Sequence, residues 1–266
     1  MASAGLTRAV WAGARRFPPG GVVSWQRCNH RGRPVSLLAG PAVALASAAT
    51  AGALGRRGQR CAGLLTALGA GVIGGYDDRA GARPDQGADK GVAGHVAALR
   101  AGRISAGAAK ALGLSTLGVT VAGAFVRGPG PRLVAGGVIA GAANAVNLLD
   151  VRPGRAGKLT LLAGLPLLGG PAGALAAAPV GAAAAMLPDD LGERAMLGDA
   201  GANALGALLG LRLVAGSPPS RHAAVLAVLA ALTAASELVS FSAVIAATPG
   251  LRALDSWGRL TPTLAR

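Results

Sequence analysis

The sequence predicts an all-α fold, a polytopic bundle of about eight to ten transmembrane helices in a membrane. Hydrophobic residues make up 52% of the 266 residues and charged residues only 14%, whereas a soluble domain usually carries about a quarter charged residues. The charges also leave long gaps, and these gaps lack both the polar stripe of a soluble bundle and the alternation of a β-barrel. A soluble alanine-rich bundle is the alternative fold.

Charge-free stretches mark the expected helices, and most are near the lower limit for a spanning helix, about 17–25 residues. The longest is too long for one span, and Gly169-Gly170-Pro171 near its middle predicts two short helices joined by a tight reversal. Extending 200–211 across Arg212 to about residue 216 then gives eight crossings. The stretches are 34–55, 61–76, 111–126, 133–149, 159–188, 200–211 and 222–236.

The chain is expected to form a single membrane domain over residues 1–266. Near its start, Trp11 beside several arginines is typical of a helix at the membrane interface. Near its end, Glu237 and Pro249 favour a surface helix over a ninth span. The domain is divided into 1–24, an interfacial or weak membrane helix; 25–236, the transmembrane core; and 237–266, a cytoplasmic or interfacial segment.

The loops divide unequally between two faces. When connections are assigned alternately to two sides, all eleven acidic residues fall on one side with most of the basic ones. Basic residues concentrate in cytoplasmic loops, so this side is predicted to be the cytoplasmic face of the plasma membrane. The loop with Arg56, Arg57 and Arg60 runs against this assignment. The cytoplasmic loops are then 25–36, 77–110, 150–158, 187–199 and 237–266.

Three polar clusters end helices at this predicted cytoplasmic face. Carboxylates and amides at membrane helix ends are costly unless they are paired or bind a ligand, so they are candidate functional residues. Taken singly, each cluster also has a structural interpretation as a solvated helix end, as glue between helices or as an N-cap. The clusters are Asp77 with Asp78; Asn144, Asn147 and Asp150, which at spacings of three share one helix face; and Asp199.

Together the clusters predict a site for a divalent cation and a diphosphate. Mg²⁺ favours a few carboxylates plus substrate phosphates over a closed protein cage, and nearby lysine and arginine would neutralise the remaining phosphate charge. The two cysteines give no four-ligand zinc site. The net charge of +15 comes with almost no aromatic residues for stacking, which argues against nucleic-acid binding.

The order of these motifs resembles that of the MraY/WecA-type polyprenyl-phosphate phospho-N-acetylhexosamine transferases, also called glycosyl transferase family 4. The resemblance covers roughly residues 29–210 and rests on Asp-Asp, then Asn-x-x-Asn-Leu-x-Asp, then Gly-Asp-x-Gly. The family moves a sugar-1-phosphate from a UDP-sugar to polyprenyl phosphate at the cytoplasmic face, with Mg²⁺, and releases UMP. The resemblance thus implies a transferase for cell-wall or envelope polysaccharide synthesis.

The resemblance also implies a role for individual residues. Asp77, Asp78 and Asp199 match the catalytic carboxylates, and Asp78 and Asp199 are the implied Mg²⁺ ligands. UDP-sugar and polyprenyl phosphate are the implied partners, and a homodimer is one option for the assembly. The implied substrate-binding residues are Asn144, Asn147, Asp150, Lys90 and Lys110.

The sequence departs from the family pattern near these motifs. Pro153 replaces the family's second aspartate after Asp150, and Ala202 replaces a serine. The His-rich motif of the last cytoplasmic loop is absent, because the only histidines are His30, His95 and His222.

A non-catalytic relative that binds polyprenyl phosphate or scaffolds envelope enzymes is therefore the alternative function. Within the transferase interpretation, Arg152, Arg155 and Lys158 are candidates for nucleotide phosphate contacts. A transporter is a third class, disfavoured because transporters place polar residues near the bilayer midplane and not at helix ends.

Overall fold

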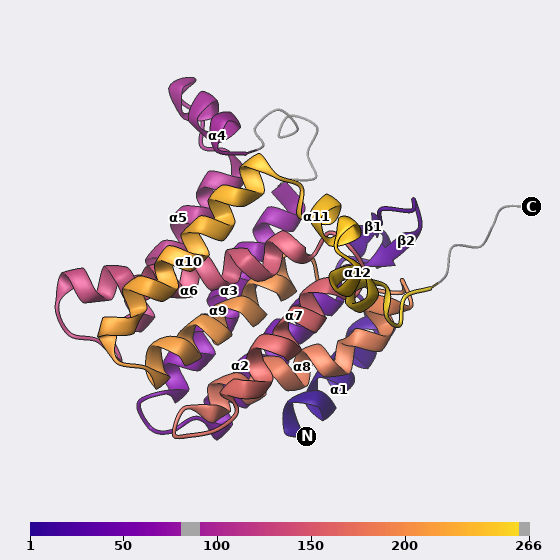
Figure 1. Ribbon diagram of the computed structural model, residues 1–266. Coiled ribbons are helices and arrows are strands. Elements are labelled where there is room, and N and C mark those ends of the chain that lie inside the picture. Colours follow the sequence, from indigo (N-terminus) through magenta and orange to yellow (C-terminus); the bar gives the residue numbers. More distant parts are fainter. Residues whose placement is uncertain (81–90, 261–266) are drawn as a thin grey trace, which may run out of the picture.

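The computed structural model describes residues 1–80 and 91–260. The described chain is nearly all α-helix, which confirms that the fold is all-α, and its long helices run side by side (Figure 1). Within these ranges the one sheet is a hairpin of β1 (Gln26–Cys28) and β2 (Pro34–Ser36), which pair antiparallel. The hairpin lies at one end of the bundle (Figure 1).

Each charge-free stretch coincides with a helix. The reversal at Gly169-Gly170-Pro171 separates α7 from α8, and Gly170 has φ +76° there. The helices are α1 (Ala2–Arg16), α2 (Ala39–Leu54), α3 (Arg60–Ala80), α4 (Gly91–Arg100), α5 (Ala106–Ala122), α6 (Pro129–Leu149), α7 (Arg155–Gly164), α8 (Gly173–Leu191), α9 (Gly198–Gly216), α10 (Pro219–Leu238), α11 (Phe241–Ala247) and α12 (Pro249–Ser256), with 3-10 turns at Val22–Trp25 and Leu165–Leu167.

Small side chains build the interior of the bundle. Helix α9 packs against α2, α3, α6 and α8, and most of its buried residues are glycine and alanine. At Gly206 a Cβ atom would lie 2.4 Å from the carbonyl oxygen of Ala142, so glycine is what lets α6 and α9 approach this closely. Such small-residue contacts are typical of helices that pack in membranes.

Many large apolar side chains lie on the outside of the bundle. Helices α6 and α10 are long and apolar enough to cross a membrane, and only 6% of the apolar window of α10 is buried within the chain. These two helices are compatible with a membrane location. Exposed large apolar residues on other helices include Leu45, Leu65, Val72, Leu112 and Leu162.

The expected eight to ten membrane-spanning helices are not found by helix length and hydropathy: among the described residues only α6 and α10 meet both conditions. Helices α2 and α5 are apolar but have 16 and 17 residues, and α7 has ten. Helices α3, α8 and α9 include carboxylates at one end and several glycines, which lower their mean hydropathy. A gap between charges is thus a weaker condition than the sustained hydropathy of a span.

The two ends of the chain differ in how they join the bundle. Helix α1 packs along α2 and α8, with Trp11 buried and Ser3 Oγ donating to the carbonyl oxygen of Ala178 at 2.6 Å. The segment 1–24, predicted to be an interfacial or weak membrane helix, thus packs on the bundle through α1. Helices α11 and α12 have seven and eight residues and lie at the hairpin end (Figure 1).

Candidate functional site

An ion-pair cluster around Lys110 joins four helices at the hairpin end of the bundle. Lys110 Nζ lies 2.6 Å from Asp77 Oδ2 and 2.5 Å from Asp199 Oδ2. Lys110 Nζ also donates to Asn147 Oδ1 at 3.3 Å, and Asn147 Nδ2 donates to Asp199 Oδ1 at 2.7 Å. The side chains of Asp77, Lys110 and Asp199 are 14, 17 and 25% exposed, so a solute can reach them. We name these four residues the Lys110 cluster.

Asp78 has a different position from its neighbour. Its Oδ1 accepts a hydrogen bond from the backbone N–H of Asp199 at 2.9 Å, and its Oδ2 accepts one from Ala200 at 3.1 Å. A carboxylate there satisfies free N–H groups at the start of α9 and complements the positive end of that helix. Both oxygens of Asp78 therefore serve as a cap, and the implied role of Asp78 as a metal ligand loses its geometric basis.

Two glycines make this cap feasible. Gly198 has φ +58°, a left-handed conformation that favours glycine, and a Cβ atom there would lie 3.0 Å from both carboxylate oxygens of Asp78. At Gly74 a Cβ atom would lie 2.2 Å from the carbonyl oxygen of Asp199. Helices α3 and α9 thus meet backbone to backbone, directly beside the Lys110 cluster.

Burial and charge shift the pKa values of the acids at these helix ends, all of which lie outside the charge-free stretches. Burial raises the pKa of Asp77 to about 6, reinforced by a hydrogen bond with Asp199 and opposed by Lys110. Burial also raises the pKa of Asp78 to about 6, reinforced by the charge of Asp199. Although burial opposes ionisation of Asp199, hydrogen bonds from Asp77 and Lys110 keep its pKa below the usual range. Asp77 therefore titrates near neutral pH, which suits proton exchange.

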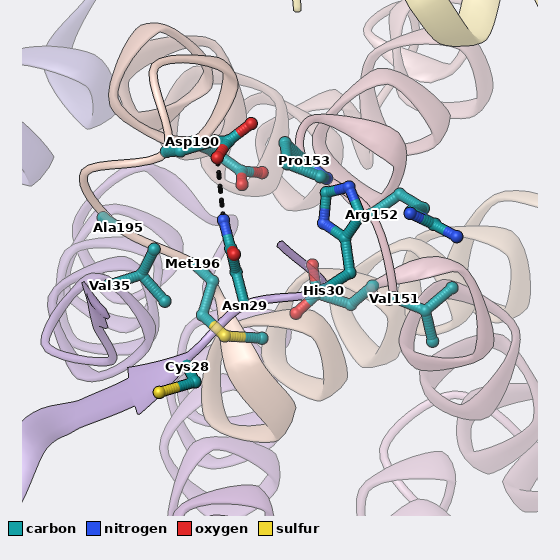
Figure 2. A pocket seen from close by; sticks show the side chains of 12 residues that line it. Cys28, Asn29, His30, Val35, Val151, Arg152, Pro153, Asp190, Ala195 and Met196 are labelled. Atoms are coloured by element: carbon teal, nitrogen blue, oxygen red, sulfur yellow. Dashed lines mark hydrogen bonds between the residues drawn. The ribbon is translucent and has the colours of Figure 1, made fainter. Parts of the chain in front are cut away.

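A second group of acids lines a cavity of about 320 Å³ next to the hairpin (Figure 2). Asp150 belongs to this cavity and not to the Lys110 cluster. Burial and the negative charge of Asp190 raise the pKa of Asp150 well above its usual range, and Asp150 Oδ2 is a buried atom with no hydrogen-bond partner among the described residues. Asp190 Oδ2 accepts from the backbone N–H of Gly154 at 3.0 Å, and burial raises the pKa of Asp190 to about 7.

Residues 29–33 form the turn of the hairpin and bring His30 to this cavity (Figure 2). Asn29 Oδ1 accepts from the backbone N–H groups of Arg31 and Arg33 at 2.8 and 3.0 Å. Asn29 Nδ2 donates to Glu193 Oε2 at 2.9 Å. Burial, together with Arg152 and Arg31, lowers the pKa of His30, so His30 faces the two acids as a neutral ring at neutral pH.

Sequence reasoning did not assign a role to Asp190 or Glu193. A signal was present, since three acids within five residues follow directly on the apolar stretch 159–188.

Asn144 does not take part in the site. Its Nδ2 donates to Thr233 Oγ1 on α10 at 2.9 Å. Three residues advance a helix by about 300°, so each step of three drifts by about 60°. Asn144 and Asp150 therefore lie on different sides of Asn147, and the prediction that all three share one face is wrong.

Other predicted residues lie away from both groups or outside the description. Arg155 pairs with Asp255, its Nε lying 2.7 Å from Oδ1, and Lys158 Nζ donates to the carbonyl oxygens of Leu254, Asp255 and Trp257 at 2.6–2.9 Å. Both cations are therefore engaged with α12 and its end, whereas Arg152 lines the cavity. Lys90 lies outside the described residues.

The oxygens of the Lys110 cluster fit a hard cation. Asp77 Oδ2, Asp199 Oδ2 and Asn147 Oδ1 all surround one point, which the ammonium of Lys110 takes. Carboxylate and amide oxygens are the donors Mg²⁺ prefers, completed by substrate phosphates. Among the described residues, no three His, Cys, Asp or Glu side chains gather as a metal site.

No protein-family profile matches the chain, and no curated protein is significantly similar to it in sequence. What the site does is therefore inferred from its residues and their geometry.

Proposed function

We propose that this protein is a multi-pass membrane phosphosugar transferase that moves a sugar-1-phosphate from a UDP-sugar to polyprenyl phosphate at the cytoplasmic face, for cell-wall or envelope polysaccharide synthesis. The observation that carries the proposal is the contact of Lys110 Nζ with both Asp77 Oδ2 and Asp199 Oδ2. Residues far apart in the chain, in the motif order of glycosyl transferase family 4, supply one partly exposed charged cluster.

The arrangement of apolar residues supports the membrane part of the proposal. Large side chains such as Leu65, Val72 and Leu112 are exposed, and alanine is the commonest residue of the buried core. The eight helices that match the charge-free stretches would then cross the membrane together, and the shorter ones would be surrounded by neighbouring helices. The Lys110 cluster would lie at the cytoplasmic face.

The cluster suits phosphoryl transfer. An oxygen of polyprenyl phosphate attacks the phosphorus next to the sugar, the bond from that phosphorus to the UMP oxygen breaks, and UMP leaves. Asp77, with a pKa of about 6, takes up or orients a proton of the acceptor phosphate. Lys110 turns from the carboxylates to the diphosphate and stabilises its developing charge. Mg²⁺, held by Asp77, Asp199 and Asn147, would supply further neutralisation of the phosphates when bound.

The acidic cavity is the candidate position for the donor nucleotide. It lies at the same end of the bundle, and Asp150 and Asp190 would donate hydrogen bonds in their protonated forms. Arg152 would supply positive charge for a phosphate. Asp150 links the two groups, since the charge of Asp199 contributes to its raised pKa.

A non-catalytic relative that binds polyprenyl phosphate is the second candidate, and one observation favours it. The ammonium of Lys110 already holds the position that a metal ion would need, and both oxygens of Asp78 are used in the cap. A chain that has given up Mg²⁺ would show these contacts in its resting state.

The experiment is transfer from a radiolabelled UDP-sugar to polyprenyl phosphate in membranes that contain the full chain, with and without Mg²⁺. We expect lipid-linked label and UMP release, both reduced by about 10²-fold or more in Asp77→Asn and Asp199→Asn. Asn144→Ala, outside the cluster, is the matched control and should keep activity. Transfer that is unchanged in Asp199→Asn overturns the proposal, and lipid binding without UMP release establishes the second candidate.

A further inference from the structure

A groove on the outer surface between α2 and α3 ends beside the candidate site. Its volume is about 460 Å³, and its lining is apolar except at one end. Leu45 from α2 and Val72 from α3 form opposite walls and are 50 and 71% exposed. The groove is thus open to whatever surrounds the bundle, which in a membrane is the hydrocarbon core.

Two glycines on α3 explain why there is a groove. Gly71 and Gly75 are four residues apart and therefore follow one another along the same helix face. At Gly71 a Cβ atom would lie 2.6 Å from the Cβ of Ala44, so the two helices touch there. At Gly75 a Cβ atom would meet only the Cβ of Ala200, at an ordinary 3.8 Å. No atom of α2 lies within 4 Å of that position, so the groove widens beyond the contact at Gly71.

The groove follows the helix axis. Its lining on α3 extends from Leu68 to Arg79, a rise of about 16 Å at 1.5 Å per residue. That is about half of a hydrocarbon core of about 30 Å. A lipid chain in a bilayer lies in this same direction.

The polar end of the groove is positively charged. Arg79 closes it, next to Tyr76, and the Arg79 guanidinium lies 4.4 Å from the ring centre of Trp25. Within the described ranges no carboxylate pairs with Arg79. Asp77 and Asp78, the preceding residues on α3, belong to the candidate site and its cap. An anion bound at Arg79 would therefore lie at the same helix end as the Lys110 cluster.

We propose that this groove binds a single long apolar chain carrying a phosphate head, with the chain between α2 and α3 and the head at Arg79. The inference rests on the proposed function in that polyprenyl phosphate is such an amphiphile. The apolar walls bury the chain, and a guanidinium binds phosphate in a planar, bidentate manner.

The test is photo-crosslinking of the purified full chain in detergent with farnesyl phosphate that carries a diazirine at its chain end, followed by peptide mapping. We expect adducts on residues 41–45 and 68–76. Gly75→Leu should reduce them about tenfold by filling the groove, whereas Gly13→Leu on α1, where a Cβ atom meets nothing within 4 Å, should not. Arg79→Gln should weaken labelling by a similar factor, and Arg57→Gln, at the other end of the bundle, should leave it unchanged.

Three outcomes overturn the inference: adducts on other helices, adducts unaffected by both Gly75→Leu and Arg79→Gln, or competition by phosphatidylglycerol as strong as by unlabelled farnesyl phosphate. The last would identify the groove as an ordinary lipid contact. Thermal unfolding verifies that each variant is folded, including Arg79→Gln, which also removes the contact of Arg79 with the Trp25 ring. Groove labelling without sugar transfer leaves this inference intact and refutes the transferase, while transfer without groove labelling refutes this inference alone.

Discussion

Asp78 Oδ1 accepts a hydrogen bond from the backbone N–H of Asp199 at 2.9 Å, so one motif aspartate positions the other. The two carboxylates lie on different helices, and the side chain that the family pattern assigns to the metal instead begins the helix that carries the second acid. Asp78 is thus a positioning residue, and its substitution should affect stability as well as activity.

The cap predicts a distinct stability pattern for Asp78. Asp78→Ala removes both acceptors and should lower the free energy of unfolding by about 1–2 kcal/mol, the usual cost of losing a helix cap. Asp78→Asn keeps one acceptor oxygen and should lose less. Thermal unfolding in detergent measures both. Equal stability of Asp78→Ala and the native chain would contradict the cap.

The Lys110 cluster predicts strong coupling between Lys110 and Asp77. Lys110→Met leaves two partly buried carboxylates without their cation and should cost about 1.5–3 kcal/mol of stability, as for hydrogen bonds to charged groups. Asp77→Asn in the same chain removes one of these charges and should recover part of the loss. A double-mutant cycle of thermal unfolding measures the coupling. Additive effects of the two substitutions would show that the contact contributes nothing.

The adjacent residues Asp189 and Asp190 predict opposite pH dependences. Burial raises the pKa of Asp190 to about 7, so the folded state holds a proton that the unfolded state releases near pH 4, and the free energy of unfolding should fall as pH rises from about 4 to 7. Although burial opposes it, hydrogen bonds from Arg8 and Arg194 keep the pKa of Asp189 below its usual range. The stabilisation that ionised Asp189 gives the folded state is therefore present above about pH 4 and is lost as pH falls.

Thermal unfolding midpoints between pH 3 and pH 8 test this pair. In Asp190→Asn the unfolding midpoint should fall less as pH rises toward neutral. In Asp189→Asn the midpoint should fall less as pH drops toward acid. The same slope in Asp190→Asn and the native chain would refute the raised pKa.

The ion pairs of Asp255 are expected to attach α11 and α12 to the rest of the bundle. It pairs with Arg155, which is 7% exposed, and with Arg259. Asp255→Asn leaves the buried guanidinium without a counter-charge, so amide hydrogen exchange should rise over α11 and α12 while α3 and α9 keep their protection. Arg252→Gln, on an exposed position of α12, is the control. Unchanged exchange in Asp255→Asn would mean that other contacts hold this segment.

The helices and the convergence of the acids could be predicted from the sequence because both follow from where charges are allowed. Charge-free stretches match the helices, and alternate assignment of loops brings Asp77 and Asp199 to one end. The number of spans could not be predicted this way, since a glycine-rich helix avoids charge without being strongly apolar. Lys110 was implied by the resemblance as a substrate-binding residue, but its central position among the carboxylates depends on how α5 packs.

The errors have a common physical origin, which is side-chain direction. Asn144 was assigned to the site by its spacing of three from Asn147, and the helical twist turns it to Thr233 on α10. Arg155 and Lys158 were candidates for phosphate contacts, and α12, about a hundred residues later in the chain, engages both. Contacts between residues so far apart in the chain produce no periodic pattern, so they cannot be predicted from a single sequence.

Because Gly74 has no side chain, α3 and α9 approach each other closely, and this approach sets the distance from Asp77 to Asp199. Even a methyl group at this position would meet the backbone of Asp199 and wedge the two helix ends apart. Substitution of Gly74, which contacts no charged group, can therefore change the distance between Asp77 and Asp199. The backbone contact between α3 and α9 therefore determines how far apart the acidic side chains of the site lie.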